Sequence, residues 1–223
     1  MVKSIIFDFD GVILESADIK TEAFRRLFEE RFPDSVDQIV EYHKKNMGIS
    51  RFVKFKQIYE RFANKSLATQ EEVALEEKFS GIIFDRILKT PMVPGAIEFL
   101  KENQKNYILI VASGTPKEEL IDIMKKRNLL HYFKEVFGSP QEKVEIIRHI
   151  IKKYGLNPSE IVFVGDAESD YNAAKTTGVR FIAKIAHFSD SNLKQGTHYI
   201  SNLNEMNQAL DKLNKGLYAN KSR

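Results

Sequence analysis

Two groups of carboxylates stand where apolar segments of the sequence end. Asp8 and Asp10 close one such segment, and Asp166 and Asp170 follow another. An Asp-x-Asp pair by itself is common in solvated turns, and Asp166 could simply cap a following helix. If the two groups meet in the fold, their carboxylates repel one another strongly unless a cation neutralises them. Because oxygen ligands without histidine or cysteine suit a hard divalent ion, the pattern predicts a site for Mg²⁺ before Ca²⁺.

A hydroxyl and a lysine add the elements of anion binding. Ser113, Gly114 and Thr115 end a third apolar segment just before a helical pattern, where a hydroxyl and free backbone amides form an anion cradle, although Ser and Thr are also routine helix caps. Lys143 opens another helical pattern and would by itself be interpreted as a surface lysine. A metal held by carboxylates, an anion cradle and a cation together describe a phosphoryl-transfer site. One of the two N-terminal aspartates is then available as a nucleophile and the other as a proton shuttle.

The segments that carry these residues alternate between strand and helix patterns. Short apolar runs predict buried parallel strands at residues 4–9, 107–112, 161–164 and 179–183, with a weaker strand at 135–138 and an edge strand at 198–201. Amphipathic patterns predict helices at residues 96–103, 117–127, 143–154 and 169–177. This alternation indicates an α/β fold with a Rossmann-like parallel sheet. Ligands of such sheets bind at the carboxyl ends of the strands, where the candidate residues lie.

A helical segment interrupts this alternation after the first strand. Helices are predicted at residues 19–32, 36–45, 52–62 and 70–87, with no convincing strand between them. We therefore expect an α/β catalytic core of residues 1–16 and 89–223 and an inserted helical cap of residues 17–88, with hinges near 15–17 and 89–93. Aromatic residues at helical spacing are expected to form the core of the cap: Phe24, Phe28, Phe52, Phe55, Tyr59 and Phe62. The polar tail, residues 216–223, is expected to fray.

Composition limits the function further. The chain has 223 residues and no cysteine, which excludes disulfides, thiolate metal sites and cysteine nucleophiles. Its formal charge of +3 is too small to indicate a nucleic-acid or membrane partner. The 5 histidines are scattered without metal-ligand spacing, and we interpret each as a surface or hydrogen-bonded side chain. We expect a cytoplasmic monomer that acts on a small-molecule phosphomonoester.

The ordered motifs resemble a known superfamily. Asp8-Phe9-Asp10-Gly11-Val12, Ser113-Gly114-Thr115, Lys143 and Gly165-Asp166-x-x-x-Asp170 are similar to the four motifs of the haloacid dehalogenase superfamily. The resemblance is to the branch with a helical cap that includes phosphoglycolate phosphatase and β-phosphoglucomutase, and it covers residues 5–183. It implies that Asp8 is the nucleophile that forms an aspartyl-phosphate, and that Asp10 is first the general acid and then the base.

The resemblance also implies a ligand set. Ser113, the Gly114 amide and Lys143 would bind the transferring phosphoryl group. Magnesium would be held by Asp8, the backbone carbonyl of Asp10 and Asp166, with Asp170 in a supporting position. Electrostatics agrees with this ligand set. An anionic carboxylate that attacks an anionic phosphoryl group meets a repulsion of about 4 kcal/mol per charge pair at about 4 Å and an effective dielectric near 20, and Mg²⁺ and Lys143 would offset it.

Departures from the family pattern bear on the type of reaction. Dehalogenases of the superfamily lack the second aspartate, which Asp10 supplies here, and the mutases carry a histidine where this chain has Lys20. Val144 stands where proline usually follows the motif lysine. A phosphatase is therefore predicted, with a phosphomutase as the alternative. A phosphate-accepting signalling module is a third possibility, but such modules are shorter and place the acceptor on a middle strand.

Substrate choice is expected to depend on the cap. The segment from His43 to Arg51, which ends in Gly48-Ile49-Ser50-Arg51, resembles a Gly-x-Ser-Arg loop with which some relatives hold the rest of a sugar phosphate. On this analogy Arg51, together with Lys45, would bind a distal anionic or hydroxyl group. The competing interpretation is a solvated basic face of two helices.

Overall fold

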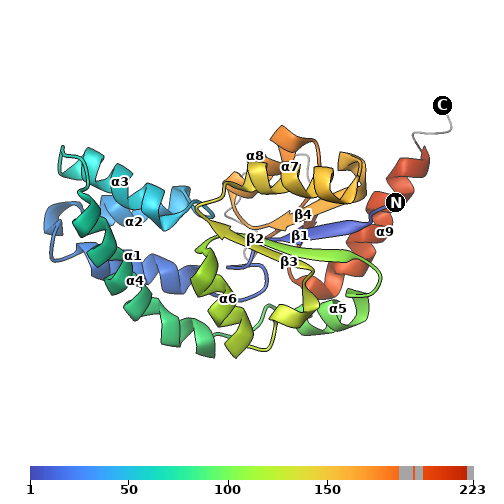
Figure 1. Cartoon of the computed structure of the whole chain (residues 1–223), viewed down its shortest axis with the longest axis horizontal. Helices are drawn as coiled ribbons and strands as arrows, with labels where there is room; N and C mark the ends of the chain where they lie inside the picture. The colour runs from blue at the N-terminus through green and yellow to red at the C-terminus, as the bar shows by residue number, and fades with distance from the viewer. Residues whose placement is uncertain (186–192, 194–197, 220–223) are drawn as a thin grey trace.

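A parallel sheet forms the centre of the protein. The computed structural model describes residues 1–185, 193 and 198–219, and within them the strands follow the order β3-β2-β1-β4-β5-β6 with every neighbouring pair parallel (Figure 1). Their bounds are β1 Ser4–Phe7, β2 Ile108–Pro116, β3 Glu135–Ser139, β4 Ile161–Gly165, β5 Arg180–Lys184 and β6 His198–Ile200. Since β1 lies between β2 and β4, the chain reverses its direction across the sheet there, and the carboxyl ends of these strands lie together.

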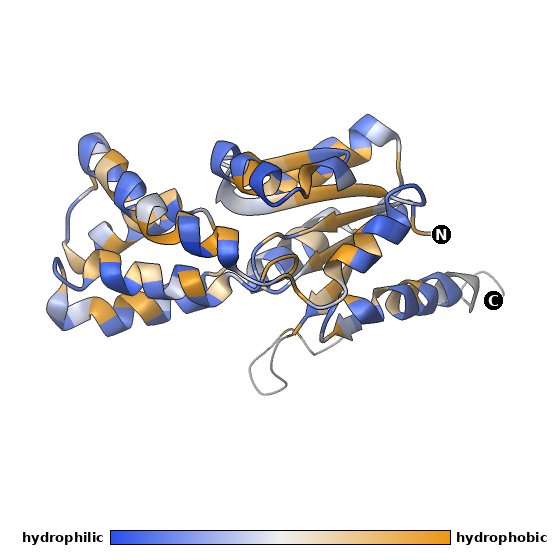
Figure 2. Cartoon of the chain, turned by 90° about the horizontal axis from the view of Figure 1, so that it is seen from below, coloured by the Kyte–Doolittle hydropathy of each residue, from blue (hydrophilic) through white to orange (hydrophobic). Residues whose placement is uncertain are grey.

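Helices cover both faces of the sheet, as the alternation of side chains along β1 requires. Ile5 and Phe7 belong to a core shared with α5 (Ala96–Asn103), α6 (Lys117–Lys126) and α9 (Met206–Ala219), whereas Ile6 belongs to a core shared with α7 (Lys143–Tyr154) and α8 (Glu168–Thr177). Figure 2 shows the hydrophobic residues of the sheet enclosed between these helices. Strands that are buried on both faces must be apolar throughout, which is why the sequence shows them as unbroken apolar runs.

Four further helices form a block beside the carboxyl ends of the strands (Figure 1). This helical block consists of α1 (Ala17–Phe28), α2 (Val36–Lys45), α3 (Arg51–Phe62) and α4 (Thr69–Lys89). Its centre is aromatic: Phe55 packs edge-on against Phe28 and Phe79, with ring centroids 6.0 and 5.9 Å apart. Such pairs combine a large buried apolar area with a favourable ring geometry, so the block has a core of its own.

The α/β fold class predicted from the sequence is confirmed, and most elements match their predicted bounds. Single-turn 3₁₀ segments complete the described structure: Pro33–Ser35, Leu130–Tyr132, Pro158–Glu160 and Leu203–Glu205. Of the aromatic residues predicted for the core of the cap, Phe24, Phe28, Phe55 and Tyr59 are buried and Phe62 packs against the core, whereas Phe52 is half-buried and belongs to neither core. Among the described residues, none of the helices is both long enough and apolar enough to cross a membrane.

Four details differ from the predictions. β2 continues through Ser113 to Pro116 because its pairing with β3 shifts register after Ala112. α1 ends at Phe28 rather than at residue 32. Helix α9 was not predicted, because its surface-facing positions are polar and only its apolar side, including Met206 and Leu210, packs on the core. The tail expected to fray from residue 216 is helical to Ala219, and residues 220–223 lie outside the described residues.

Two chain segments connect the helical block to the sheet, and they run side by side. The backbone of Glu15 donates to Pro91 O at 3.1 Å, and that of Val93 donates to Ile13 O at 3.0 Å. Arg127, at the end of α6, holds the end of α4: its Nη1 lies 3.1, 2.8 and 2.6 Å from the carbonyl oxygens of Ile87, Leu88 and Thr90. The Ile87 carbonyl also accepts from the Thr90 amide at 3.2 Å, and the guanidinium adds a charged donor to all three carbonyls at the end of the helix.

Replacing Arg127 by methionine should therefore destabilise the protein, because it keeps the length of the side chain but leaves the three carbonyls of α4 without their cationic donor. We expect a loss of about 1–2 kcal/mol in the free energy of unfolding, measured by urea denaturation. The exposed neighbour Lys125 is the control, and Lys125→Met should change stability by less than about 0.5 kcal/mol. Equal stabilities of the two variants would contradict the role given to Arg127.

Candidate active site

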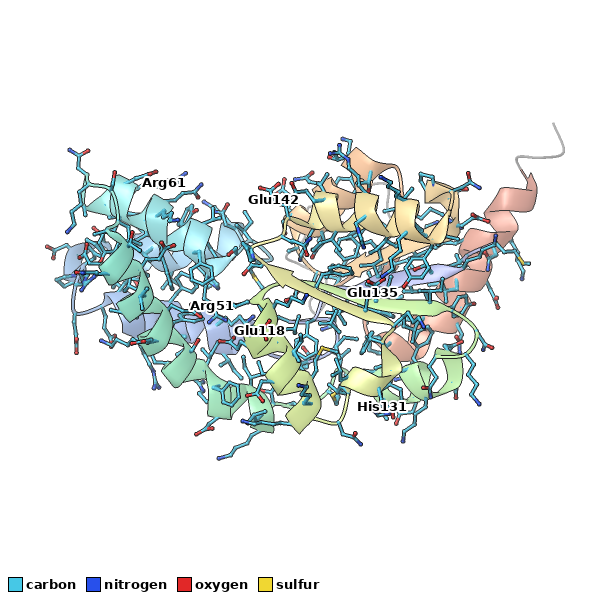
Figure 3. All side chains as sticks on the ribbon, in the orientation of Figure 1. Arg51, Arg61, Glu118, His131, Glu135 and Glu142 are labelled. Atoms are coloured by element: carbon cyan, nitrogen blue, oxygen red, sulfur yellow. The ribbon has the colours of Figure 1, made fainter. Side chains whose placement is uncertain are left out.

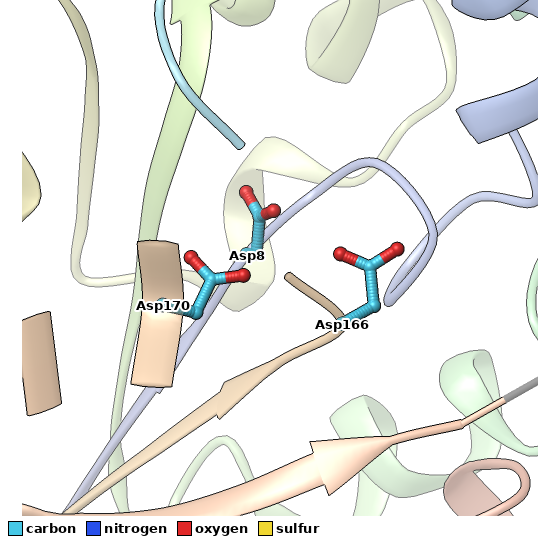
Figure 4. Close-up of side chains that lie close together, drawn as sticks. All are labelled: Asp8, Asp166 and Asp170. Carbon is cyan, nitrogen blue, oxygen red and sulfur yellow. The ribbon is translucent and has the colours of Figure 1, made fainter. Parts of the chain in front are cut away.

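Three carboxylates from different elements meet at the carboxyl edge of the sheet. Asp8 follows β1, Asp166 follows β4 and Asp170 lies in the first turn of α8, and each offers an oxygen within 4.8 Å of the others (Figure 4). Gly11 makes this approach possible. It has a φ of +79°, and a Cβ atom added there would lie 2.0 Å from Asp166 Oδ2. Only glycine fits a position that combines this backbone conformation with so close a neighbour.

Lys143 lies against this group from the N-terminus of α7. Its Nζ is 3.3 Å from Asp8 Oδ2 and forms an ion pair with Asp170. Asp170 also accepts a hydrogen bond of 3.1 Å from the Ala167 amide. Lys143 is buried, so the interpretation as a surface lysine is wrong. Burial acts to lower the pKa of Lys143, but the carboxylates of Asp170 and Asp8 outweigh it and raise the pKa above its usual value, so the side chain is a cation.

Lys143 does not fully neutralise the negative charges of the other two carboxylates, Asp8 and Asp166. Burial, reinforced by the charges of Asp170 and Asp10, raises the pKa of Asp8 to about 7, although Lys143 opposes the shift. Burial and the charges of Asp8 and Asp170 raise the pKa of Asp166 well above its usual value. Both shifts show a concentration of negative charge that a divalent cation would relieve, and oxygen donors alone are what Mg²⁺ prefers. The residues present therefore fit a magnesium ion.

Asp10 points to a different set of partners. Its Oδ2 accepts from Thr115 Oγ1 at 2.8 Å and pairs with the Lys20 ammonium, and its Oδ1 accepts from Ser16 Oγ at 2.6 Å. Burial acts to raise the pKa of Asp10, but Lys20 and these hydrogen bonds outweigh it, so the pKa is lowered. Lys20 also donates to Thr115 Oγ1 at 2.7 Å. The two aspartates of the first motif are thus held in opposite electrostatic environments, although they are two residues apart.

The end of β2 brings the predicted anion cradle to the same place. Ser113 is buried, and its Oγ accepts a hydrogen bond of 3.1 Å from the Thr115 amide. Gly114 lies directly under the loop before α3, since a Cβ atom on it would be 2.7 Å from Gly48 O. Ser169 Oγ donates to Met47 O at 2.9 Å, which ties the same loop to α8. The helical block therefore touches the sheet edge on both sides of the carboxylates.

A cavity of about 50 Å³ lies between the sheet edge and the helical block. The sheet edge contributes Asp8, Asp10, Ser113, Gly114, Thr115 and Asp166, and the helical block contributes Lys20, Phe24, His43, Arg51, Lys54 and Phe79, among others. All but one of the residues singled out as a possible site therefore meet at or directly behind one cavity wall, as the predicted convergence required. The exception is Lys45, and Arg51 lines the wall with its guanidinium already paired.

Neither basic residue of the cap is placed as the loop analogy suggested. Arg51, which Figure 3 labels on the helical block, lines the cavity. Its guanidinium makes two bonds of 2.9 and 2.5 Å to Glu119 of α6 and a contact of 3.3 Å to Glu76. The Lys45 side chain is 72% exposed and pairs with Glu41 on its own helix. It is absent from the lining of the cavity. The interpretation as a solvated face therefore describes Lys45 but not Arg51.

Sequence reasoning missed two residues of the cavity wall, His43 and Lys54. Both are buried, and Lys54 Nζ lies 3.1 Å from His43 Nδ1. The interpretation of every histidine as surface-lying or hydrogen-bonded holds for only one nitrogen of His43, because Nδ1 bonds to Lys54 while Nε2 has no partner among the described residues. It is right for His131, His149 and His198, which are exposed, while His187 lies outside the described residues. No local signal marks Lys54 among the many lysines, because only the packing of α2 on α3 brings it to the cavity.

Comparison with known proteins finds a family model, relatives and a solved structure that each match most of the chain. The family model of the haloacid dehalogenase-like hydrolases matches residues 5–184. The chain is 24% identical to a phosphorylated carbohydrates phosphatase of Thermotoga maritima, over 83% of this chain and 86% of that protein. It is 27% identical to a phosphoglycolate phosphatase of Mannheimia succiniciproducens, over 79% and 82%. A crystal structure of β-phosphoglucomutase from Clostridium difficile has the same fold, with a TM-score of 0.77, 22% identity and coverage of 98% and 100%.

The raised pKa of Asp8 predicts how stability should depend on pH without a metal. Between its usual value of 3.8 and about 7, folded Asp8 keeps a proton that the unfolded chain has released. This carboxyl therefore destabilises the fold increasingly as pH rises through that window. In EDTA, Asp8→Asn should gain stability relative to the wild type between pH 5 and about 7, measured by urea denaturation at each pH.

The exposed Asp85 provides the matched control, because Asp85→Asn removes a carboxylate outside the site. Its stability difference from the wild type should stay constant over the same pH range. A constant difference for Asp8→Asn as well would mean that Asp8 is already ionised in the metal-free protein, contrary to the geometry described above.

Proposed function

Because the chain belongs to the haloacid dehalogenase-like hydrolase family, we propose that it is a magnesium-dependent phosphatase that hydrolyses a small phosphorylated metabolite of the sugar-phosphate or phosphoglycolate type. The phosphatase class agrees with the printed names of its relatives. The observation that carries the proposal is the position of Asp8: it lies in the cavity beside Asp166, Ser113 and Gly114, with Lys143 against its Oδ2.

Asp8 is the proposed nucleophile. The amide of Phe9 donates to Oδ1 at 2.8 Å, which fixes the carboxylate and leaves Oδ2 next to Lys143. In the first step Oδ2 bonds to phosphorus while the bond from phosphorus to the leaving oxygen breaks, and an aspartyl-phosphate forms. Ser113 and the Gly114 amide are placed to bind the phosphoryl oxygens, and the Lys143 ammonium offsets their charge.

Asp10 is the proposed proton carrier. It would donate a proton to the leaving oxygen and then take one from the water that hydrolyses the aspartyl-phosphate. The pKa of Asp10 is lowered here, although burial opposes the shift, because Lys20 and the hydroxyls of Ser16 and Thr115 favour the charged form. An ionised Asp10 is the form that the second step requires, since only the carboxylate accepts the proton of the attacking water. The first step requires a protonated Asp10, so Asp10 has to take up the proton for the leaving oxygen when the phosphomonoester binds.

Magnesium would be held by Asp8, Asp166 and the backbone carbonyl of Asp10, with Asp170 in support. When bound, it supplies positive charge that offsets the repulsion between the attacking carboxylate and the phosphoryl group. Asp170 is already paired with Lys143 and the Ala167 amide, so its function is to orient Lys143 and the first turn of α8. The raised pKa values of Asp8 and Asp166 support this division, because burial leaves these two carboxylates most in need of a cation.

We further propose that residues 17–88 act as a cap on the core formed by residues 1–16 and 89–223. The loop around Gly48 covers Gly114 and bonds to Ser169, so in this arrangement it separates the carboxylates from bulk water. The segments around residues 15–17 and 89–93 are the proposed hinges, since they are the two connections between the parts and the chain beside them is paired through Glu15 with Pro91 and through Val93 with Ile13. A cytoplasmic location and a monomeric state accompany the proposal as predictions from composition.

Phosphate release from a panel of small phosphomonoesters, including p-nitrophenyl phosphate, should require Mg²⁺ and stop in EDTA. Asp8→Asn removes the nucleophile while keeping its size, and should lower kcat by at least about a thousandfold. Asp85→Asn is again the control and should retain the wild-type rate. Absence of turnover with every ester, with Mg²⁺ present, would overturn the proposed function.

The products distinguish a phosphatase from a phosphomutase. For a hydrolase, the phosphate released should equal the substrate consumed, as measured by a colorimetric phosphate assay beside ³¹P NMR of the sugar phosphates. Accumulation of an isomeric sugar phosphate with little free phosphate would instead assign the mutase reaction. A stable phosphoprotein without turnover would assign the signalling class.

A further inference from the structure

The cations in the cavity wall differ in how they are neutralised. Of the described residues, Lys20, Arg51 and Lys54 bring positive charge from the helical block to the cavity. Lys20 pairs with Asp10, and Arg51 pairs with Glu119 and Glu76. The described part of the chain offers no carboxylate within ion-pair distance of Lys54. The cavity therefore presents one cation whose charge the protein itself leaves without a counterion.

Lys54 is buried, so the lack of a counterion destabilises its charged form. It lies one turn after Arg51 on α3 and is 4% exposed, with Nζ 4.9 Å from the centroid of the Phe24 ring. Burial, and then the neighbouring charges of Lys20 and Arg51, lower the pKa of Lys54 to about 7. A buried ammonium without an anionic partner is destabilising, because it has lost the water that solvated it. An anion in the cavity would supply what is missing.

His43 extends the same surface. Its ring stacks on Phe24 with centroids 4.1 Å apart, and its Nδ1 faces Lys54 Nζ at 3.1 Å. Burial, and then the charge of Lys54, lower the pKa of His43 to about 2, so the imidazole is neutral. Because Nδ1 accepts from the ammonium, we assign the ring proton to Nε2, which is buried without a partner among the described residues. The pair thus offers N–H donors and no acceptor.

We propose that Lys54 and His43 form the subsite for a carboxylate of the substrate, so that the preferred substrate is a compact phosphomonoester with a second anionic group. This inference rests on the proposed function. A carboxylate accepts hydrogen bonds at both oxygens and supplies the negative charge that neutralises Lys54, whereas a sugar hydroxyl can accept from the pair but leaves the ammonium without a counterion. The distal-anion role expected of Arg51 passes to Lys54, because Glu119 occupies the guanidinium.

Two substrates that differ only at the distal group test this subsite. Phosphoglycolate carries a carboxylate where 2-hydroxyethyl phosphate carries a hydroxymethyl group. We expect the wild type to favour phosphoglycolate by about ten- to a hundredfold in kcat/KM, mainly through KM, and Lys54→Met to lose this preference. Lys56 lies on the same helix, is exposed and pairs with Glu72, so Lys56→Met is the matched control and should keep the preference.

Binding provides a readout that does not depend on turnover. In 3-phosphonopropanoate a methylene replaces the ester oxygen of phosphoglycolate, and propylphosphonate lacks its carboxylate. By calorimetry with Mg²⁺ present, the wild type should bind 3-phosphonopropanoate about tenfold or more tightly than propylphosphonate. Equal affinities in the wild type would overturn the inference even if Lys54→Met failed to fold.

The failures of the two proposals are distinguishable. Hydrolysis of both substrates at similar kcat/KM, or a preference that survives in Lys54→Met, overturns the carboxylate subsite and leaves the phosphatase intact. A preference for 3-phosphonopropanoate that depends on Lys54, in a protein that hydrolyses no phosphomonoester, supports the subsite and overturns the phosphatase.

Discussion

Negative charge gathered in a buried place is the constraint on which the rest of the site depends. Asp8, Asp166 and Asp170 bring oxygens within 4.8 Å of one another, and among the described residues Lys143 is the cation placed against them. One ammonium cannot neutralise three carboxylates. Burial, reinforced by the neighbouring carboxylates, therefore raises the pKa of Asp8 to about 7 although Lys143 opposes the shift. A structure that keeps such a group together is prepared for a cation and for a reaction in which negative charge moves. The same repulsion that makes the metal-free site unfavourable gives the ion its binding energy.

The topology of the sheet makes this concentration of charge possible. β1 lies between β2 and β4, and since all are parallel, residues more than a hundred positions apart in the sequence meet at one edge. Glycines permit the final approach: Gly11 leaves room for Asp166, and Gly165 leaves room for Asp170, whose Cβ would lie 2.4 Å from an added Cβ. The site therefore requires glycine, which has no side chain, at these two positions as much as it requires the carboxylates themselves.

This dependence explains what could be predicted from the sequence. Strands buried on both faces must be apolar, so the sheet and the polar residues at its carboxyl edge could be located from local patterns. The helix α9 could not, because its pattern is largely polar. Lys143 could be assigned only through its order among the motifs, and Arg51 appeared available because Glu119 lies 68 residues away. His43 and Lys54 carry no local signal at all, since burial and the loss of counterions are properties of tertiary packing.

The distribution of charge partners also suggests an order of events. Lys54, His43 and Phe24 all belong to the helical block, so their contacts persist when the block moves relative to the sheet. The bonds from Arg51 to Glu119, by contrast, join α3 to α6 of the core and exist only while the two parts touch. If the helical block moves as proposed, a carboxylate bound by Lys54 would stay with the block, whereas the Arg51–Glu119 pair would break and re-form. With the proposed subsite, α3 would bind the substrate through one cation and join the block to the core through another, one helical turn apart.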